Sequence, residues 1–437
     1  MRTPPQRVSS TVVIFEAGVV VYMKVEFLLW PLDNPANSSV LKLLDHNRLL
    51  IDLSIMTASN PPPKILLSGA TGYVGGSVLH YLLKHPSLTS IITSSSPITV
   101  PVRGTPDRVK KLTDSYGSLV KPVSIASYDD TLALTALASE HDIIINAGSG
   151  FHPPSAEAFV HGLAKRKDRN GGRPVWIIHT SGASNIADKP LTGVNRPDAE
   201  YEDAFAEKVY EFEEAEDVKD PYPQRTAELA VLRAGEELGV NAVSIQSPCI
   251  FGPGAGLFNK AGLMIPIMTG YVLKNGCGLT LGDETGCIDY VHVSDLADLY
   301  VLCVLDIIDR GGVNVPKGKK GIMFPTVGRT LTIDIPRKCL DIAFATGNLP
   351  KKGGPREKIV RNVSLEEAAE TCAGNKDVTE TGYAGHRKTK GTVAREQLGW
   401  KPIYGEEAWC KDFETELRAA LNGQRPYTMG NCIAGTK

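Results

Sequence analysis

Cysteine is sparse in this chain of 437 residues, and the eight cysteines all lie from Cys249 onward. They form no C-x-x-C pair and no Cys/His cluster at zinc spacing, which argues against a disulfide framework and against a structural metal site. We therefore expect no metal, and we expect a reducing compartment, the cytoplasm.

An excess of positive charge and a long uncharged run are also missing. The formal net charge is −2, which does not favour nucleic acid as a partner. The apolar stretch TVVIFEAGVVVYMKVEFLLW is interrupted by Glu16, Lys24 and Glu26, so it falls short of the roughly 20 uncharged residues of a membrane span. No P-loop and no nucleophile elbow occur. The composition leaves a globular protein, for which we expect no membrane partner.

The first 55 residues differ from the rest of the chain. Met56 opens MTASNPPPKILLSG, a short polar segment that leads into the first apolar run of a regular pattern. We interpret residues 1–55 as an extension outside the fold, translated from an upstream start codon.

From Lys64 onward, short β-rich runs alternate with amphipathic segments. The runs are KILLSG, ITVPVRG, VSIAS, DIIINAG, PVWIIHTSG and NAVSIQSP. This alternation is typical of a parallel sheet with helices on both faces. The fold class that we predict is α/β, a doubly wound parallel sheet with a smaller C-terminal α/β region.

Three glycines stand at the first strand-to-helix junction, in KILLSGATGYVGGSVLHYLL. Gly69, Gly72 and Gly75 would let backbone N–H groups and a helix N-terminus approach a pyrophosphate, where a Cβ would obstruct the turn. The alternative is a tight turn without a ligand. The position at the first strand favours a dinucleotide.

Several motifs in sequence order resemble the extended short-chain dehydrogenase/reductases, including their epimerase/dehydratase-like and NmrA-like branches. The motifs are SGATGYVG (68–75), HDIIINAG (141–148), PVWIIHTSGAS (174–184), SPCIFGPG (247–254), DYVHVSDLADLY (289–300) and LGWKP (398–402). The resemblance covers about residues 64–420 and has the pattern of an atypical, fungal-type member. It implies a Rossmann-type NAD(P)-binding domain over residues 56–255, interleaved with a substrate-binding region over residues 256–437.

The resemblance also implies the residues that bind the cofactor. Asp129 corresponds to a position that contacts adenine, although a carboxylate there also suits a helix cap. The implied cofactor-binding residues are Gly69, Thr71, Gly72, Tyr73, Val74, Gly75, Asp129, Asn146, Ala147, Gly148, Pro248 and Ile250.

The charge after the second strand bears on the choice of cofactor. A carboxylate there holds the ribose 2′-OH of NAD, whereas an arginine accommodates the 2′-phosphate of NADP. The sequence offers Arg103, with Arg108 nearby and no acid before Asp107. NADP is favoured and NAD stays an alternative, since Arg103 also suits a solvated surface.

The implied catalytic residues depart from the family pattern. The family pairs a tyrosine with a lysine four residues later, but Tyr222 is followed by Thr226. At the position of the catalytic hydroxyl stands Gly182, so Thr180, Ser181 and Ser184 are displaced substitutes. Because Pro223 suits the first position of a helix, we expect Tyr222 at the helix edge. A phenol without a lysine stays protonated near neutral pH and donates better than it abstracts.

Other candidates are weaker. His152 suits a loop or a helix cap, His179 and His292 suit buried hydrogen bonds, and the acidic run from Glu200 to Asp220 suits a solvated helix face.

Two functions remain open from the sequence. The first is an NAD(P)-dependent oxidoreductase that reduces a small organic molecule, or performs epimerase/dehydratase-like chemistry. The second is a catalytically silent NAD(P)-binding redox sensor or interaction protein of the NmrA-like kind, which the missing lysine favours. Whether the chain forms a homodimer is left open.

Overall fold

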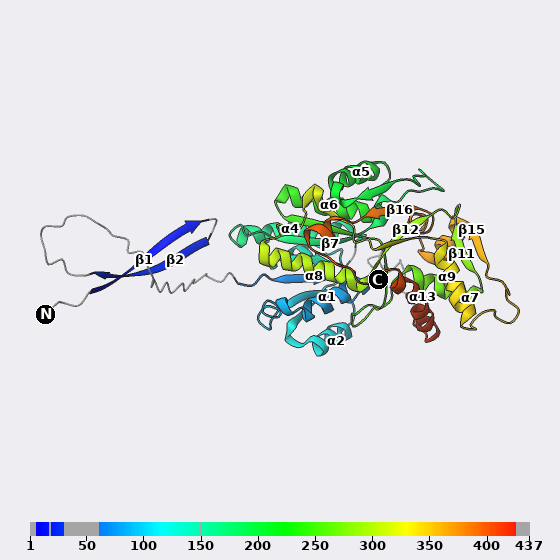
Figure 1. The fold of residues 1–437 in the computed structure, drawn as a ribbon, viewed down its shortest axis with the longest axis horizontal. Helices are drawn as coiled ribbons and strands as arrows, with labels where there is room; N and C mark the ends of the chain where they lie inside the picture. Colours follow the sequence, from blue (N-terminus) through cyan, green and yellow to red (C-terminus); the bar gives the residue numbers. More distant parts are fainter. Residues whose placement is uncertain (1–5, 17–18, 30–60, 149, 425–437) are drawn as a thin grey trace, which may run out of the picture. The chain divides into compact units, whose positions relative to one another are not determined.

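The computed structural model describes residues 6–16, 19–29, 61–148 and 150–424, and for residues 6–29 it describes the backbone alone. The chain divides into two compact units, Met1–Pro62 and Pro63–Lys437. In the first unit, β1 (Gln6–Glu16) and β2 (Val19–Leu29) pair antiparallel along their full lengths (Figure 1). The sequence analysis did not predict this pair. Residues 30–60, with Met56, lie outside the described residues.

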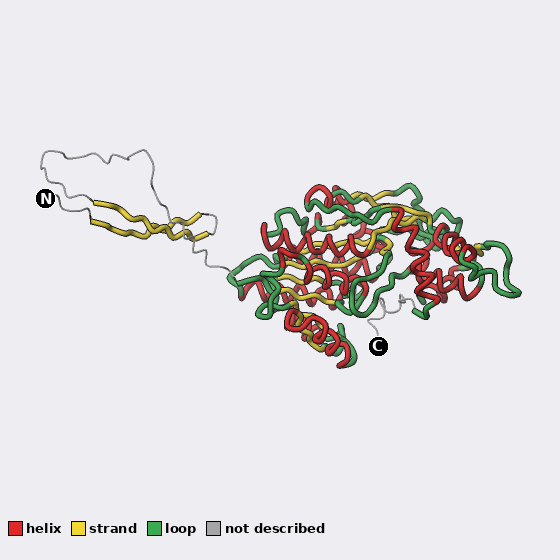
Figure 2. The backbone as a smooth tube through the Cα atoms, turned by 60° about the horizontal axis from the view of Figure 1, so that its bottom comes forward, coloured by secondary structure: helices red, strands yellow, loops and turns green. Residues whose placement is uncertain are grey.

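A parallel sheet of seven strands forms the centre of the second unit. Its order is β13-β9-β7-β6-β3-β4-β5, and each neighbouring pair is parallel. Figure 2 shows these strands lying between layers of helices. The strands are β3 (Ile65–Ser68), β4 (Ile98–Val102), β5 (Val120–Ser124), β6 (Ile143–Asn146), β7 (Trp176–Gly182), β9 (Asn241–Ser247) and β13 (Ile322–Met323). The predicted doubly wound α/β fold is confirmed, with β5 beginning three residues earlier than the predicted run.

Both faces of this sheet are covered because successive side chains of each strand point to opposite sides. Ile65 and Leu67 face one core, with residues of α1 (Tyr73–Lys84), α2 (Pro106–Tyr116) and α8 (Val293–Arg310). Leu66 faces the other, with residues of four further helices. These are α3 (Thr131–Ala138), α4 (Pro153–Arg169), α5 (Ala206–Lys219) and α6 (Pro223–Leu238).

A second sheet extends the unit beyond the large one. Its parallel strands are β10 (Cys249–Phe251), β12 (Cys287–His292), β16 (His386–Lys390) and β8 (Glu200–Glu202), with β14 (Gly328–Leu331) antiparallel to β12. A separate parallel pair joins β11 (Gly278–Leu281) and β15 (Val360–Val363). In the chain, β8 lies between β7 and β9 of the large sheet, and β10 lies between β9 and β13. The chain therefore passes between the two sheets more than once.

The remaining helices, apart from α12, whose Val393 and Ala394 pack in the first core, form a third core. Phe251, Tyr290 and Trp409 pack there as an aromatic group, with Tyr290 stacked on Trp409 at 4.5 Å between ring centroids. Figure 1 shows α7, α9 and α13 gathered with β11 and β15 at one end of this unit. The helices are α7 (Met264–Asn275), α9 (Asp334–Ala345), α10 (Leu365–Cys372), α11 (Lys376–Tyr383), α12 (Val393–Gln397) and α13 (Glu406–Leu421).

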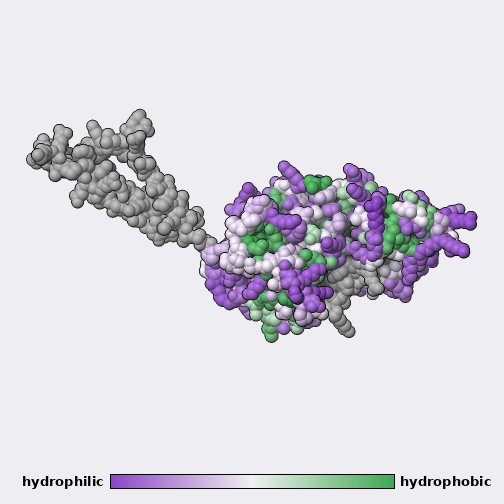
Figure 3. All heavy atoms as spheres, turned by 90° about the horizontal axis from the view of Figure 1, so that it is seen from below, coloured by the Kyte–Doolittle hydropathy of each residue, from purple (hydrophilic) through white to green (hydrophobic). Residues whose placement is uncertain are grey.

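The surface is of mixed character. Figure 3 shows one face on which hydrophilic residues surround separate hydrophobic patches. In the part of the chain that the structure describes, no helix combines the length and apolarity that crossing a bilayer requires.

Candidate active site

The turn between β3 and α1 closes too tightly for side chains. Gly69 has φ +78°, and a Cβ there would lie 2.1 Å from the carbonyl oxygen of Ala147. A Cβ on Gly75 would lie 2.3 Å from the carbonyl oxygen of Gly69. No side chain caps the helix at Gly72, so backbone N–H groups of the first turn remain available to an anion. These features fit the pyrophosphate of a dinucleotide.

A cavity of about 270 Å³ opens beside this turn, at the carboxyl ends of the central strands. Its lining includes residues from the glycine turn, from the segments after β6, β7 and β9, and from the region beyond residue 256. The predicted residues that line it are Gly72, Tyr73, Val74, Ala147, Gly148, Thr180, Ser181, Tyr222, Pro248 and Ile250. The structure thus brings most predicted cofactor and catalytic residues to one cavity.

The other predicted residues lie outside this lining. Gly69, Thr71 and Gly75 belong to the turn itself, while Asn146 is buried and accepts a hydrogen bond from the Ser68 hydroxyl at 2.7 Å. Their roles toward a cofactor stay predictions.

Arg103 directly follows β4, and Asp129 follows Tyr128 in the chain. The Arg103 guanidinium lies 4.6 Å from the ring centroid of Tyr128, whose hydroxyl borders Gly148. The Asp129 side chain is 82% exposed and accepts hydrogen bonds from Ser127 and His152. His152 also caps α4, as its cap alternative predicted. Contacts of Arg103 and Asp129 with a cofactor stay predictions.

Tyr222 immediately precedes α6, which begins at Pro223 as predicted. The side chain is 4% exposed, and its hydroxyl has no hydrogen-bond partner among the described residues. Its ring meets Phe151 edge-on at 5.9 Å. Burial raises the pKa of Tyr222, while the nearby Ser184 and Thr381 hydroxyls and the charge of Arg387 offset part of the rise. The phenol is therefore protonated and available at neutral pH.

The hydroxyl groups near the carboxyl end of β7 are already engaged. Thr180 shares a 2.6 Å hydrogen bond with the Tyr300 hydroxyl, and the Ser181 hydroxyl accepts from Asn185 at 3.0 Å. At Gly182 a Cβ would lie 2.8 Å from the amide nitrogen of Gln224. The Gln224 side chain, which the sequence analysis did not single out, thus occupies the space that a hydroxyl side chain at 182 would need.

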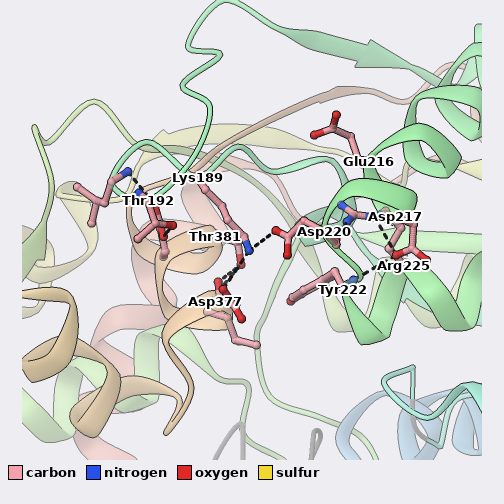
Figure 4. Close-up of polar contacts among 12 residues, drawn as sticks. Lys189, Thr192, Glu216, Asp217, Asp220, Tyr222, Arg225, Asp377 and Thr381 are labelled. Carbon is pink, nitrogen blue, oxygen red and sulfur yellow. Dashed lines mark hydrogen bonds and ion pairs between the residues drawn. The ribbon is translucent and has the colours of Figure 1, made fainter.

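Ion pairs hold the outer wall of the cavity. Lys189 contacts both Asp220, two residues before Tyr222, and Asp377, beside the lining residue Val378 (Figure 4). Two walls that are distant in sequence are therefore joined next to the phenol.

Behind Ser181 lies a buried pair of carboxyl groups. Glu213 and Glu228 are both fully buried, and the Gln246 side-chain amide donates to each of them. Asn185 donates to Glu228 at 2.6 Å. Burial raises the pKa of both acids, that of Glu228 to about 7. The interpretation of residues 200–220 as a solvated face is therefore wrong at Glu213, because α5 turns this residue toward α6.

The remaining histidines have structural surroundings. Burial lowers the pKa of His179 and of His292 to about 4, and each accepts or shares a hydrogen bond through Nδ1. Within the described ranges, no group of three or more His, Cys, Asp or Glu side chains has metal-binding geometry.

Comparisons with known proteins find individual proteins that are similar to this chain. No family model matches the chain. A curated relative, the oxidase ucsJ of an Acremonium species, is 26% identical over 351 residues, which are 78% of this chain and 93% of the relative.

Solved structures resemble the chain over most of their length. A dTDP-glucose 4,6-dehydratase double mutant from Streptomyces venezuelae, with NAD and DAU bound, has TM-score 0.54 and 13% identity, covering 81% of this chain and 96% of the dehydratase. UDP-glucose 4-epimerase from Thermotoga maritima, with UDP-glucose, has TM-score 0.50 and 16% identity, covering 82% and 99%. The NmrA-like and fungal-type assignments stay predictions. The chain has the Rossmann-type fold of these epimerases and dehydratases.

Proposed function

We propose that this chain is an NAD(P)-dependent oxidoreductase that reduces a carbonyl group of a small organic molecule. The observation that carries the proposal is the unpartnered phenol of Tyr222, which shares a cavity with Gly72, Ala147 and Pro248. The similarity of this chain to a relative that is named an oxidase supports redox chemistry rather than epimerisation.

The glycine turn would hold the cofactor pyrophosphate, and Ala147, Gly148, Pro248 and Ile250 would border its nicotinamide half. A nicotinamide cofactor held there would supply the hydride for reduction of the carbonyl carbon. Tyr222 donates its proton to the carbonyl oxygen, and the phenolate that remains takes a proton from solvent before the next turnover. Because burial keeps the phenol protonated, reduction is favoured at neutral pH and oxidation only at high pH.

The test compares Tyr222→Phe with the wild type. We expect the variant to bind NADPH with nearly unchanged affinity and to lose reduction of any compound found active in a panel of small aldehydes and ketones. Tyr271→Phe, on α7 and outside the cavity, is the matched control and keeps its activity. Wild-type turnover by Tyr222→Phe would remove this tyrosine as the acid and bring Thr180 or Ser181 forward.

NADP is the cofactor that we propose, because the guanidinium of Arg103 lies at the carboxyl end of β4. Exchange of Arg103 for Asp is expected to shift binding from NADPH toward NADH, measured by titrating each cofactor. The same exchange at the exposed Arg337, on α9, controls for net charge. An unchanged ratio of the two affinities would contradict the assignment.

A silent NAD(P)-binding sensor is the second candidate. It is favoured by Thr226, whose hydroxyl donates to Asp217 where the family pattern has a lysine. Dinucleotide binding without turnover of any compound in the panel would support this candidate over the reductase.

A further inference from the structure

Arg387 is a buried arginine in the wall of the cavity. It lies on β16, opposite Ile288 of β12, and only 8% of the residue is exposed. Among the described residues that line the cavity, it alone carries a formal charge at neutral pH. The sequence analysis did not single it out.

The guanidinium of Arg387 is only partly satisfied. Nη2 donates to the carbonyl oxygen of Gly382 at 2.7 Å and lies 3.9 Å from the sulfur of Met264. Nε is buried and has no partner, and no described carboxylate pairs with the group. Donors therefore remain for an acceptor that this chain does not supply.

The groups around Arg387 do not compensate its charge. Tyr222, Tyr383 and Cys249 lie nearest as weak acids, but burial raises the pKa of each, that of Cys249 to about 12. Asp289 also acts on Arg387, yet its carboxylate pairs with Arg329. Burial lowers the pKa of Arg387. Arginine nevertheless stays charged at neutral pH, so a buried positive charge is left over.

Among the described residues, the buried Arg225 and the partly buried Arg166 are both paired with carboxylates. Arg225 contacts Asp217 at 3.2 Å, and Arg166 contacts Asp142 at 2.8 Å. A buried cation without a partner is costly, and an anion that enters the cavity would remove this cost. The difference between Arg387 and these two arginines thus points to a ligand.

We propose that the cavity takes a small organic acid, whose carboxylate is held by Arg387 and whose carbonyl group is reached by Tyr222. The inference rests on the proposed function and names its substrate class. A carboxylate carries the single charge that matches one guanidinium, whereas a phosphate dianion would leave a charge uncompensated. Phe151, Leu263, Met264 and Ile267 line the remainder of the cavity, which favours an apolar acid.

The experiment compares acids with their neutral esters in the full-length chain. Probes are 4-methyl-2-oxopentanoate and phenylpyruvate, the methyl ester of each, and inorganic phosphate, measured by thermal shift and titration in the presence of NADPH. We expect the acids to bind to the wild type at least about tenfold more tightly than the esters, and Arg387→Met to lose this difference. Arg387→Lys keeps a cation and is expected to retain a weaker preference for acids.

Equal binding of acids and esters by the wild type would overturn the inference, and so would an undiminished preference for acids in Arg387→Met. Preference for phosphate over both acids would also overturn it. NADPH binding is measured first, so failure of the proposed function appears as a chain that binds no dinucleotide, whereas failure of this inference leaves dinucleotide binding intact.

A second measurement decides if no probe binds. Without ligand, Arg387→Met removes an unpaired buried charge, so its melting temperature is expected to rise by about 2 °C or more. A fall in melting temperature would mean that the fold itself compensates Arg387, and it would overturn the inference.

Discussion

Replacing Glu228 by Gln should change how the stability of this protein depends on pH. Glu228 and Glu213 share the amide of Gln246 in a fully buried cluster, so burial opposes the ionisation of both acids, and the charge of Glu228 also opposes that of Glu213. A carboxyl with a raised pKa binds its proton more tightly in the folded state. The contribution of the carboxyl to the unfolding free energy is therefore fully present below its pKa in the unfolded state, and it is lost as the pH rises toward its pKa in the folded state.

The magnitude follows from the shift. Burial raises the pKa of Glu228 from 4.5 to about 7, and each unit corresponds to about 1.4 kcal/mol. Between pH 5 and pH 8 the wild type should thus lose about 2 to 3 kcal/mol of unfolding free energy through this group. Glutamine has nearly the same shape but does not ionise. Between pH 5 and pH 8, Glu228→Gln should therefore lose about 2 to 3 kcal/mol less unfolding free energy than the wild type.

Urea unfolding at several values between pH 5 and pH 8 measures the effect. Trp176, Trp400 and Trp409 are all buried, so their fluorescence reports the transition. The expected result is near-equal stability of variant and wild type at pH 5 and a variant about 2 kcal/mol more stable at pH 8.

Glu237 provides the control, because it lies on the exposed face of the same helix and allows the same substitution. The unfolding free energy of Glu237→Gln should equal that of the wild type at every pH measured. If Glu228→Gln also runs parallel to the wild type, then Glu228 does not hold a proton in the folded state and the argument from the buried pair is refuted.

Two further changes test the cofactor turn and the second sheet. Gly69→Ala should abolish NADPH binding in a titration, because its Cβ would meet the carbonyl of Ala147. The control Gly270→Ala, on α7 with open space around it, should bind NADPH normally and gain up to about 1 kcal/mol in unfolding free energy. Normal NADPH binding by Gly69→Ala would contradict the fit of a dinucleotide to this turn. Arg329→Met should cost about 3 kcal/mol in urea unfolding because it leaves the fully buried Asp289 without its ion pair, and a loss below about 1 kcal/mol would show that Thr389 alone satisfies this carboxylate.

The fold was predictable because its signals are local. Each strand of the large sheet except the two-residue β13 was visible as a short apolar run, and the turn at Gly69 was visible as glycine spacing. The β1–β2 pair was missed because charged residues in TVVIFEAGVVVYMKVEFLLW were weighed only against a membrane span.

The site was predictable only where it is built from motifs. Thr180 and Ser181 lie at the end of a strand, and Tyr222 directly precedes a helix, both of which the sequence reveals. Arg387 shares its cavity with Tyr222 although 165 positions separate them, and β16 reaches its place only through pairing with β12 and β8. A Tyr-x-x-x-Arg spacing, Tyr383 to Arg387, is present, but α11 ends at Tyr383, so helical periodicity does not relate the two.

Position 226, which holds lysine in the family that the sequence resembles, lies beside a carboxylate in this chain. Asp217 accepts hydrogen bonds from the backbone of Tyr222, from Arg225 and from the hydroxyl of Thr226 (Figure 4). A lysine at position 226 would therefore meet a carboxylate that fixes the start of α6, and its charge would be directed to Asp217 rather than to the phenol. Among the described lining residues, positive charge comes instead from Arg387, on β16. The phenol precedes α6 and the guanidinium lies on β16, so the proposed reaction depends on these two segments being held together, which the contacts of Lys189 with Asp220 and Asp377 do beside the phenol.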